Sequence, residues 1–464
     1  MPFEWSIIKN IHELLSRDKT CNLCLKARET ALKLLEEGLK AADPYKAVSK
    51  NIVVYGDKIK VAGEELKPSR IFVVGFGKAS IAMAKAIEDK LGNRIDEGVI
   101  SAPKSLREEK ISLKKIRIVW AGHPYPDEGS VKAGYEISGL VKKANKNDLV
   151  IALVSGGGSA LMEYPANNIT LNDFIETTKL LLKSGATIQE INTVRKHISL
   201  VKGGWLARHA YPAKLIALII SDVVGDPIDS IASGPTAPDP TTFHDVQNVL
   251  KKYNLWNKVP ESVREYIKRG VKGLVPETPK PGDKIFTNTK NVIIASNIES
   301  LKKMANMSKD LGYNVIILTS MLEGEAREVG RVLASIAIDA KLHGNPIKPP
   351  AIILAGGETT VTVRGKGRGG RNQELALSAA FTISEVHGIA IASIGTDGID
   401  GLTPYAGGIV DAHSINRAKK LGLNPEELLI DNNSYEFFNK LGDGIYTGPT
   451  GTNVNDLQIM VIEK

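Results

Sequence analysis

The chain of 464 residues contains only two cysteines, Cys21 and Cys24, in the segment CNLC. Two cysteines cannot build the disulfide framework that stabilises small secreted proteins. A C-x-x-C pair can be a redox pair or half of a zinc site, but no histidine or cysteine with ligand spacing follows it. We therefore expect both cysteines to be ordinary residues of a helix, in a protein from a reducing compartment.

Long apolar runs are also missing. No stretch approaches the roughly 18 to 20 continuous apolar residues that a membrane-spanning helix requires. The first residues, MPFEWSIIKN, have no basic region followed by an apolar one, so we expect no secretory signal. The absence of both features predicts a cytoplasmic protein with no membrane partner.

Charge of one sign is not concentrated anywhere in the chain. Lysine and arginine number 60 against 52 acidic residues, a formal charge of +8, and the basic residues are spread among the acids. A nucleic-acid-binding protein shows clustered basic residues, so we expect no nucleic-acid partner. Hydrophobic residues at 42% and charged residues at 24% are typical of a globular protein with a sizeable core.

Apolar periodicity predicts the secondary structure. Residues 1–45 have helical spacing of leucines that ends at Asp43-Pro44, and residues 51–63 alternate apolar and polar around Gly56-Asp57, which indicates a hairpin. Compact apolar runs then alternate with helical patterns, and each run ends in glycine or a polar residue. They begin at Ile71, Leu149, Lys214, Asn291, Asn314, Ala351 and Ile389. Such runs are typical of buried parallel strands, so the predicted fold class is α/β.

The length predicts more than one domain. Two proline-rich stretches, 234–241 and 273–284, resemble linkers. We place the boundary near the second, which gives an N-terminal domain of residues 1–280 and a C-terminal domain of residues 281–464.

Ligands of open parallel sheets bind outside the carboxyl ends of the strands, so the residues that follow each strand carry the functional predictions. The first strand leads into Gly75-Phe-Gly77-Lys78-Ala79-Ser80. A lysine in the first turn of a helix is electrostatically unfavourable, which suggests that Lys78 serves an anionic ligand. The segment is neither a Walker A loop nor a dinucleotide fingerprint, and a plain strand-to-helix turn remains the alternative.

The next two strands also end in polar loops. Ser155, Gly156, Gly157, Gly158 and Ser159 can form a nest of backbone donors for phosphate or carboxylate, or a flexible loop. Asp222 follows a strand beside these loops, where a carboxylate suits Mg²⁺; a turn or helix cap is the alternative.

The C-terminal half contains three further candidates. Glu358 follows a strand in GGETT, and Asp397 and Asp400 follow another in GTDGIDG, where they suggest a metal-binding or hydroxyl-binding turn. Between them, four cations alternate with glycines in a composition suited to gripping phosphate, or to a basic surface turn. These residues are Arg364, Gly365, Lys366, Gly367, Arg368, Gly369, Gly370 and Arg371.

Other polar residues carry weaker predictions. His123 and His197 each lack a recognisable partner and are more typical of structural histidines than of catalytic bases. Arg195, Lys196 and Lys202 either serve an anionic ligand or lie on a solvated helix. Polar residues of the segment 450–456 precede the last strand and could close a cleft.

These features together favour phosphoryl transfer. That chemistry needs mainly positioning and charge neutralisation, for which Lys, Arg, Mg²⁺ and glycine loops suffice. No Ser-His-Asp order is compelling, and no cysteine is placed as a nucleophile.

The motifs resemble those of the glycerate 2-kinase family, whose C-terminal part is called the MOFRL domain. The matching segments run in order from about Ala41 to Asp456. They are ADPYKAV, VGFGKAS, AGHPYPDEGS, VSGGGSAL, INTVRKHIS, ISDVVGDP, IASGPTAPDPTTF, GGETTVTV, GKGRGGRNQE and GTDGIDG.

The resemblance implies a two-domain α/β enzyme with mainly parallel sheets. The N-terminal domain would be Rossmann-like, the C-terminal domain of the MOFRL type, and the active site would lie in the interdomain cleft. Family members transfer the γ-phosphoryl group of ATP to the 2-hydroxyl of D-glycerate, with Mg²⁺ or another divalent cation. The small-molecule substrates would be D-glycerate and ATP, and the protein would be a monomer or a homodimer.

The resemblance also implies roles for matching residues. Lys78 and Arg371 would neutralise the substrate carboxylate and the transferring phosphoryl group, and Gly369 and Gly370 would help to bind phosphate. Asp222, Glu358 or Asp397 would hold the cation, and one of them would accept the proton of the 2-hydroxyl.

Two other functional classes stay open. Relatives of this family have been labelled hydroxypyruvate reductases, but an NAD(P)H-dependent oxidoreductase needs a nicotinamide site, and neither glycine-rich loop has the dinucleotide fingerprint. A non-catalytic sensor of phosphorylated ligands would bind without turnover. The dispersed carboxylates argue against it, since they repel phosphate unless a metal is bound.

Overall fold

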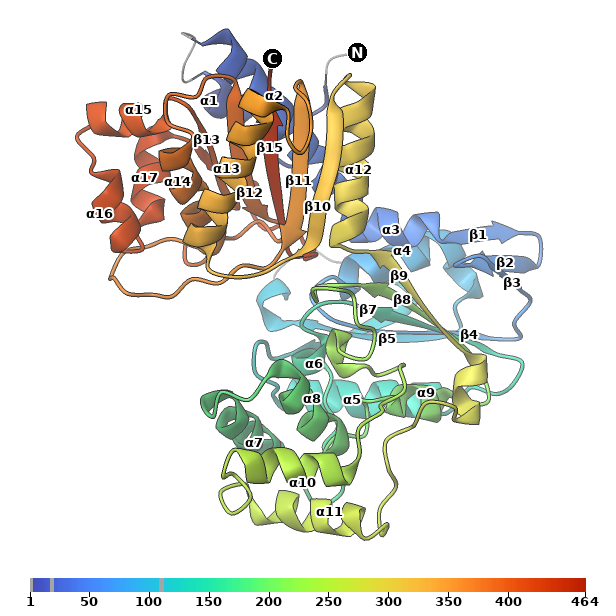
Figure 1. The fold of residues 1–464 in the computed structure, drawn as a ribbon. Helices are drawn as coiled ribbons and strands as arrows, with labels where there is room; N and C mark the ends of the chain where they lie inside the picture. Colours follow the sequence, from blue (N-terminus) through green and yellow to red (C-terminus); the bar gives the residue numbers. More distant parts are fainter. Residues whose placement is uncertain (1–2, 17–20, 108–111) are drawn as a thin grey trace. The chain divides into compact units, whose positions relative to one another are not determined.

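The computed structural model describes residues 3–16, 21–107 and 112–464, which form two compact units (Figure 1). The internal unit is Pro44–Ile294. The split unit combines Met1–Asp43 with Ala295–Lys464. These units do not follow the division at residue 280 that the proline-rich stretch suggested. No helix among the described residues combines the length and apolar character needed to cross a membrane.

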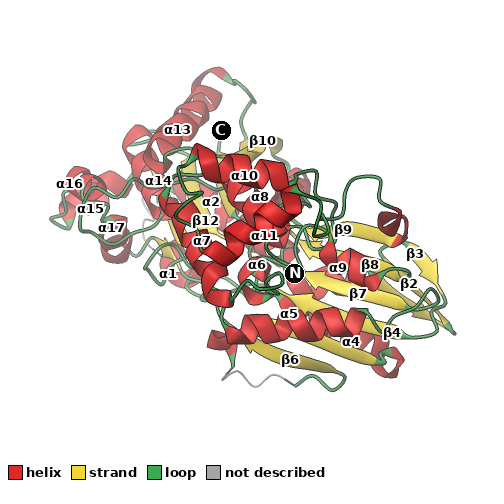
Figure 2. Ribbon diagram, turned by 90° about the horizontal axis from the view of Figure 1, so that it is seen from below, coloured by secondary structure: helices red, strands yellow, loops and turns green. Residues whose placement is uncertain are grey.

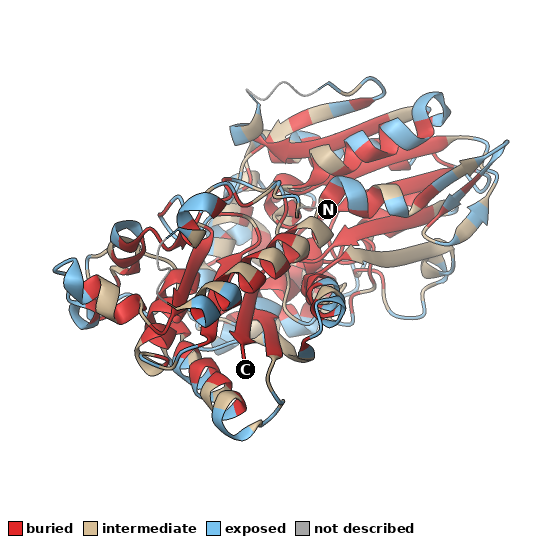
Figure 3. Cartoon of the chain, turned by 90° about the horizontal axis from the view of Figure 1, so that it is seen from above, coloured by how far each residue is buried: buried red, intermediate tan, exposed pale blue. Residues whose placement is uncertain are grey.

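The internal unit is built on a six-stranded sheet in the order β6-β5-β4-β7-β8-β9. β4 to β8 are mutually parallel, as the apolar runs predicted. Every residue of β4 and β7 is buried. Figure 3 shows that buried residues, in red, make up most of the length of several strands. The strands are β4(Ile71–Phe76), β5(Glu97–Pro103), β6(Ile116–Ala121), β7(Leu149–Val154), β8(Lys214–Ile220) and β9(Thr289–Ala295).

Helices cover both faces of this sheet, as in a doubly wound α/β fold. On one face, α5(Glu128–Val141) and α9(Trp205–Ala210) share a core with alternate residues of β4 and β7. α4(Ser80–Leu91) packs against the sheet and against α3(Pro44–Lys50) (Figure 1), and Figure 2 shows α5 lying over the strands.

Two additions complete the internal unit. The predicted hairpin around Gly56 is confirmed: β1(Ile52–Tyr55), β2(Lys58–Val61) and β3(Glu64–Leu66) form an antiparallel sheet. A helical subdomain has its own apolar core, and three of its helices begin with capping boxes. Its helices are α7(Leu171–Lys183), α8(Ile188–His197), α10(Phe243–Lys252) and α11(Glu261–Val271); short helices of the unit are α6(Gly158–Leu161), η1(Gly92–Arg94), η2(Lys104–Leu106), η3(Ile231–Ser233) and η4(Lys284–Asn288).

The split unit contains a mixed sheet in the order β10-β11-β15-β12-β13-β14. β10 and β11 are parallel, but β15 runs antiparallel to both β11 and β12. The expectation of mainly parallel sheets therefore holds for the internal unit and not here, because the last strand enters between two strands that point the same way. The strands are β10(Asn314–Leu322), β11(Ala351–Gly357), β12(Ile389–Gly395), β13(Gly407–Asp411), β14(Gly444–Ile445) and β15(Asp456–Ile462).

Helices also cover both faces of this mixed sheet (Figure 1). One core joins the sheet to α1(Ile11–Leu15), α2(Asn22–Ala41) and α12(Asn297–Asp310). The other joins it to the remaining helices. These are α13(Ala326–His343), α14(Arg371–Thr382), α15(Ser414–Lys420), α16(Pro425–Ile430) and α17(Ser434–Leu441).

Packing explains why the units differ from the predicted domains. α2 buries one face against β12, β15 and α12. It approaches α12 so closely that a Cβ on Gly38 would lie 2.7 Å from the sulfur of Met304. Arg28 of α2 is 3% exposed and bridges two buried carboxylates, Asp411 at 2.8 Å and Asp443 at 2.6 Å. At the other boundary, β9 pairs with β8, so the stretch 273–284 lies within the internal unit.

Candidate functional site

The strand order of the internal unit creates a topological switch point between β4 and β7. β5 and β6 lie on one side of β4, whereas β7 and β8 lie on the other. Open parallel sheets bind ligands outside the carboxyl ends of the strands at such a point. The segments that follow β4 and β7 are the two glycine-rich loops singled out by the sequence, residues 77–80 and 155–159.

These two loops are bonded to each other. The backbone N–H of Lys78 donates to the carbonyl of Gly156 at 2.8 Å, and the N–H of Ala79 donates to Oγ of Ser155 at 3.1 Å. Gly77 has φ +124°, and a side chain there would collide with Ser155. Glycine is therefore required at position 77, where it lets the two loops approach closely and bond to each other.

Lys78 projects along the glycine loop toward His123. A Cβ on Gly157, which has φ +77°, would lie 3.0 Å from the His123 ring and 3.3 Å from Cγ of Lys78. Lys78 is half-buried. A cation beside a glycine loop and before the N-terminus of α4 is an arrangement that binds anions.

His123 lies in the same place but cannot add a second charge there at neutral pH. Burial, and secondarily the charge of Lys78, lower the pKa of the His123 imidazole below its ordinary value. A neutral imidazole can position a ligand through one donor and one acceptor nitrogen.

Asp222 approaches the glycine loop from the end of β8. The carboxylate lies so close to Gly156 that a Cβ on this glycine would collide with Oδ2 of Asp222. The structure thus brings Lys78, the Ser155–Ser159 loop and Asp222 together, as the sequence predicted for neighbouring strand ends.

Arg195 and Lys202 form hydrogen bonds to the end of the glycine loop. The carbonyl of Ser159 accepts hydrogen bonds from Nη2 of Arg195 at 3.2 Å and from Nζ of Lys202 at 3.0 Å. Lys202 is 1% exposed and lies 3.0 Å from the carboxylate of Glu163. Burial lowers the pKa of Lys202 to about 8, against the opposing effect of Glu163. Neither residue belongs to a solvated helix face, the alternative that the sequence left open.

Lys196 and His197 have structural roles in the same unit. The Lys196 side chain is 5% exposed and pairs with Asp229 at 3.4 Å and Asp239 at 3.6 Å. Nδ1 of His197 lies 2.8 Å from the carbonyl of Thr193, one turn earlier in α8. These contacts confirm the structural reading of His197.

The split unit has a second polar cluster at one edge of its sheet. β15 begins where β11 and β12 end. Its first residue, Asp456, pairs with Gly357 at the end of β11 and with Gly395 at the end of β12. The carboxyl ends of two strands and the amino end of a third therefore meet there.

Arg371, the first residue of α14, is the centre of this cluster. Its Nε donates to Oδ2 of Asp456 at 2.6 Å, its Nη2 donates to Oδ1 at 3.0 Å, and its Nη1 donates to Glu358 at 2.8 Å. The bidentate pair fixes the guanidinium plane. The Arg371 side chain remains 32% exposed, so this oriented cation is accessible.

Asp456 was expected only as one of the polar residues of 450–456 that could close a cleft, and not as a catalytic, phosphate-binding or metal-binding residue. It is fully buried, and burial raises the pKa of its carboxyl to about 7, although Arg371 acts in the opposite direction. A buried carboxylate with a perturbed pKa beside an accessible arginine is typical of functional sites. The only signal in the sequence was an aspartate at the start of the last strand.

The two aspartates after β12 have different roles. Asp400 is buried and accepts the backbone N–H groups of Asn372 at 3.1 Å and Gln373 at 2.8 Å, so it caps α14. Burial raises the pKa of Asp400. Asp397 is half-buried, and its Oδ1 accepts only the N–H of Ile399, at 3.2 Å, among the hydrogen bonds between described residues. Asp397 is therefore the more accessible of the two carboxylates.

Packing, rather than a ligand, accounts for much of the glycine and arginine segment. A Cβ on Gly365 or Gly367 would collide with the backbone of Asp431. Backbone N–H groups of the segment already donate to Asp431, Asn432 and Asn433. The side chains of Arg364, Lys366 and Arg368 are exposed, as expected for a basic surface turn. Phosphate binding by Gly369 and Gly370 stays a prediction.

Magnesium binding by Asp222, Glu358 or Asp397 is compatible with these positions. In the described part of the chain, none of the three belongs to a group of three carboxylate, histidine or cysteine ligands at metal-binding distance. Mg²⁺ does not require such a cage, since it binds through one or two carboxylates plus substrate phosphates. Asp397 and Asp222, which are half-buried, fit that mode better than Glu358, which is already paired with Arg371.

Two family models match the sequence. One is described as a domain of unknown function (DUF4147) and covers residues 30–268; the other is the MOFRL family model, which covers residues 351–456. The first lies almost wholly within the internal unit, and the second within the split unit.

Curated relatives match over nearly the whole chain. A protein of Pyrococcus horikoshii named glycerate 2-kinase is 46% identical over 95% of this chain and 98% of its own length. A protein of Thermotoga maritima named D-glycerate 2-kinase is 41% identical over 94% and 98%. A protein of Agrobacterium vitis named putative hydroxypyruvate reductase is also 41% identical, over 94% of both chains.

The fold matches as well. The crystal structure of a glycerate kinase from Thermotoga maritima superposes with a TM-score of 0.84 at 41% identity, covering 94% of this chain and 99% of that one. Identity of this level over both units cannot come from a shared α/β architecture alone. The chain belongs to the glycerate 2-kinase family.

Proposed function

We propose that the protein is a glycerate 2-kinase that transfers the γ-phosphoryl group of ATP to the 2-hydroxyl of D-glycerate, giving 2-phosphoglycerate and ADP. The observation that carries this proposal is the full-length identity of 46% and 41% to relatives named glycerate 2-kinase. The site chemistry agrees with it, because phosphoryl transfer requires oriented cations and backbone donors more than covalent groups.

In the internal unit, we assign Lys78 and the Ser155–Ser159 loop to anion binding. The Lys78 ammonium and the loop held by Lys202 and Arg195 form a preorganised positive environment. Such groups stabilise charge that develops on transferring phosphoryl oxygens without reorganising during the reaction.

In the split unit, we assign Arg371 to the substrate carboxylate or the phosphoryl group. Asp456 acts as a positioning residue, since its bidentate contact orients the guanidinium while one side remains accessible. Arginine suits this task because its planar fork matches the geometry of carboxylate and phosphate oxygens.

Asp222, Asp397 or Glu358 would hold Mg²⁺ or another divalent cation, which neutralises phosphate oxygens when bound. One of these carboxylates would accept the proton of the 2-hydroxyl. We further propose a cytoplasmic monomer or homodimer that acts on small molecules and not on nucleic acid.

Product analysis tests this proposal directly. The purified protein is incubated with D-glycerate, ATP and Mg²⁺, and the phosphoglycerate isomer is identified by NMR. We expect 2-phosphoglycerate; 3-phosphoglycerate would keep the kinase reaction but contradict the regiochemistry.

Hydroxypyruvate reduction is the second candidate because two relatives from Agrobacterium vitis are named putative hydroxypyruvate reductases. Oxidation of NADH or NADPH by the protein in the presence of hydroxypyruvate, without phosphorylation of glycerate, would replace the kinase proposal.

A further inference from the structure

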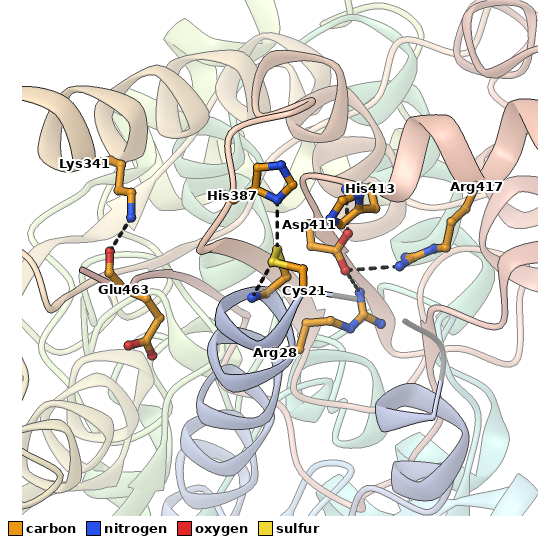
Figure 4. The surroundings of a disulfide bond; sticks show 9 residues. Cys21, Arg28, Lys341, His387, Asp411, His413, Arg417 and Glu463 are labelled. Carbon is orange, nitrogen blue, oxygen red and sulfur yellow. Dashed lines mark hydrogen bonds and ion pairs between the residues drawn. A yellow bond between two sulfur atoms is a disulfide. The ribbon is translucent and has the colours of Figure 1, made fainter. Parts of the chain in front are cut away.

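Three segments of the split unit, far apart in sequence, bring four soft or borderline ligands to one place. Cys21 caps the N-terminus of α2, and Cys24 lies in its first turn. His387 precedes β12, and His413 follows β13 and caps α15. One ligand atom from each of the four residues lies within 4.8 Å of every other (Figure 4).

The sheet topology explains this convergence. β12 and β13 are antiparallel neighbours with Ala390 opposite Asp411, so the loop before β12 and the loop after β13 lie at the same edge. The N–H of Glu385 donates to the carbonyl of Ala412 at 2.9 Å and ties the two loops together. α2 packs on the same sheet and places its first turn over these loops.

The cluster contains two imidazole rings in addition to the cysteine pair. Cys21 and Cys24 form a disulfide in the structure, and Sγ of Cys24 lies 3.9 Å from Nδ1 of His387. The rings of His387 and His413 lie 4.8 Å apart. Nε2 of His413 is buried without a hydrogen-bond partner among the described residues. A disulfide accounts for the two sulfurs but not for two imidazoles converging on them.

We propose that Cys21, Cys24, His387 and His413 form a structural Zn²⁺ site in the reduced protein. Two thiolates and two imidazoles are an established tetrahedral zinc donor set, with Zn–S near 2.3 Å and Zn–N near 2.0–2.1 Å. Tetrahedral coordination at these lengths needs ligand atoms about 3.3 to 3.8 Å apart. The ligand atoms that lie farthest apart, within 4.8 Å of one another, would have to approach by about 1 to 1.5 Å, and the two sulfurs of the disulfide would have to separate.

The site and the disulfide exclude each other. A dithiol reductant transfers two electrons and two protons to the disulfide, giving two thiols, and is itself oxidised to a disulfide. Zn²⁺ then displaces the two thiol protons and binds two thiolates and two neutral imidazoles, so the bound cluster carries no net charge. The helix N-terminus and the N–H of Cys24, 3.2 Å from Sγ of Cys21, favour thiolates at this position.

The consequence of zinc binding is structural. A cross-link between residues three apart constrains the unfolded chain little, whereas one ion that joins α2 to loops more than 360 residues later closes very long loops. The site lies at the amino end of β12, and the Arg371 cluster lies at its carboxyl end, about 20 Å away for a seven-residue strand. The proposal is therefore independent of the proposed function.

Zinc content and coordination of the full-length protein test the proposal. The protein is produced with zinc in the medium, purified in a dithiol without chelator, and analysed by mass spectrometry of metals and by zinc K-edge X-ray absorption. We expect one Zn²⁺ per chain with two sulfur and two nitrogen ligands. The substitutions His387→Asn and His413→Asn should each weaken Zn²⁺ binding by at least tenfold, measured by competition with a chromophoric chelator. His343→Asn is the control, since His343 is exposed and contacts Asp339.

A second measurement does not depend on the variants folding. Reduced wild-type protein stripped of metal is titrated with Co²⁺, which should give the visible spectrum of tetrahedral thiolate coordination with a one-to-one end point. Failure of the reduced protein to take up Zn²⁺ or Co²⁺ would overturn the proposal. Stoichiometric zinc that both histidine variants retain as tightly as the wild type would also overturn it.

Discussion

Replacing Lys78 by alanine separates the anion-binding role of this residue from any role in folding. The Lys78 side chain is half-buried, so its removal leaves no fully enclosed cavity. The substitution also removes a cation next to the N-terminus of α4, where positive charge is unfavourable by about 0.3–1 kcal/mol. We therefore expect the free energy of unfolding to stay the same or to rise by up to about 1 kcal/mol.

Catalysis should respond in the opposite direction. Two unit charges about 4 Å apart interact by ~4 kcal/mol at an effective dielectric constant of about 20. Lys78 is half-buried, so solvent screens part of that energy. A remaining loss of about 2.7 kcal/mol in transition-state stabilisation corresponds to about a 10²-fold fall in kcat/KM.

The assay couples ADP formation to a spectrophotometric signal, with D-glycerate and ATP varied separately. Lys85→Ala is the matched control, because Lys85 lies on α4, is 49% exposed and pairs with Asp89 in the next turn. Its kcat/KM should stay within about twofold of the wild-type value, as expected for a surface change. Chemical denaturation measures the stability of both variants.

The reasoning would be refuted if Lys78→Ala kept kcat/KM within about threefold of the wild type, since that loss is worth less than about 1 kcal/mol. A fall in activity together with a large loss of stability would equally contradict it, because Lys78 would then stabilise the fold instead of binding a ligand.

Three further predictions follow from other contacts. Arg371→Lys cannot reproduce the bidentate contact with Asp456, so we expect kcat/KM to fall at least about tenfold with little change in unfolding midpoint; unchanged kinetics would remove Arg371 from the site. Arg28→Met removes one of the two arginines that, among the described residues, pair with the buried Asp411 and Asp443, so chemical denaturation should show a loss of about 3–5 kcal/mol, and a loss below about 1 kcal/mol would disprove the bridging role. Glu190, whose pKa is lowered from 4.5 to about 2 chiefly by Lys252, stabilises the fold above pH 4.5 and loses this contribution as pH falls toward 2. Thermal unfolding of Glu190→Gln should therefore differ from the wild type at neutral pH and coincide with it near pH 2, and an equal gap at both pH values would contradict the ion pair.

Much of the internal unit was predictable because its signals are local. Each buried strand appears as a short apolar run, and the rule that ligands bind at the carboxyl ends of parallel strands selects the residues after it. Lys78, the Ser155–Ser159 loop and Asp222 were selected as candidates in this way, and the strand order places the segments that carry them around one switch point. The capped helices and the hairpin at Gly56 also follow from neighbouring residues.

The features that were missed depend on pairing between distant segments. No local pattern shows that β15 enters antiparallel between β11 and β12, which is what brings Asp456 to Arg371. The same limit applies to Cys21 and Cys24, whose partners His387 and His413 have no ligand spacing in the chain and meet them only across a sheet edge.

The sequence by itself determined the α/β class, the positions of the buried strands, the glycine loops at their ends and the family. These depend on apolar periodicity, backbone conformation and motif order, all of which are written along the chain. Tertiary structure alone decided that α2 joins the split unit, that Asp400 caps a helix while Asp397 stays accessible, and which cations are buried. Burial and counter-ions arise from contacts between segments far apart in sequence, so the same residue type becomes a cap, a support or a ligand according to what packs beside it.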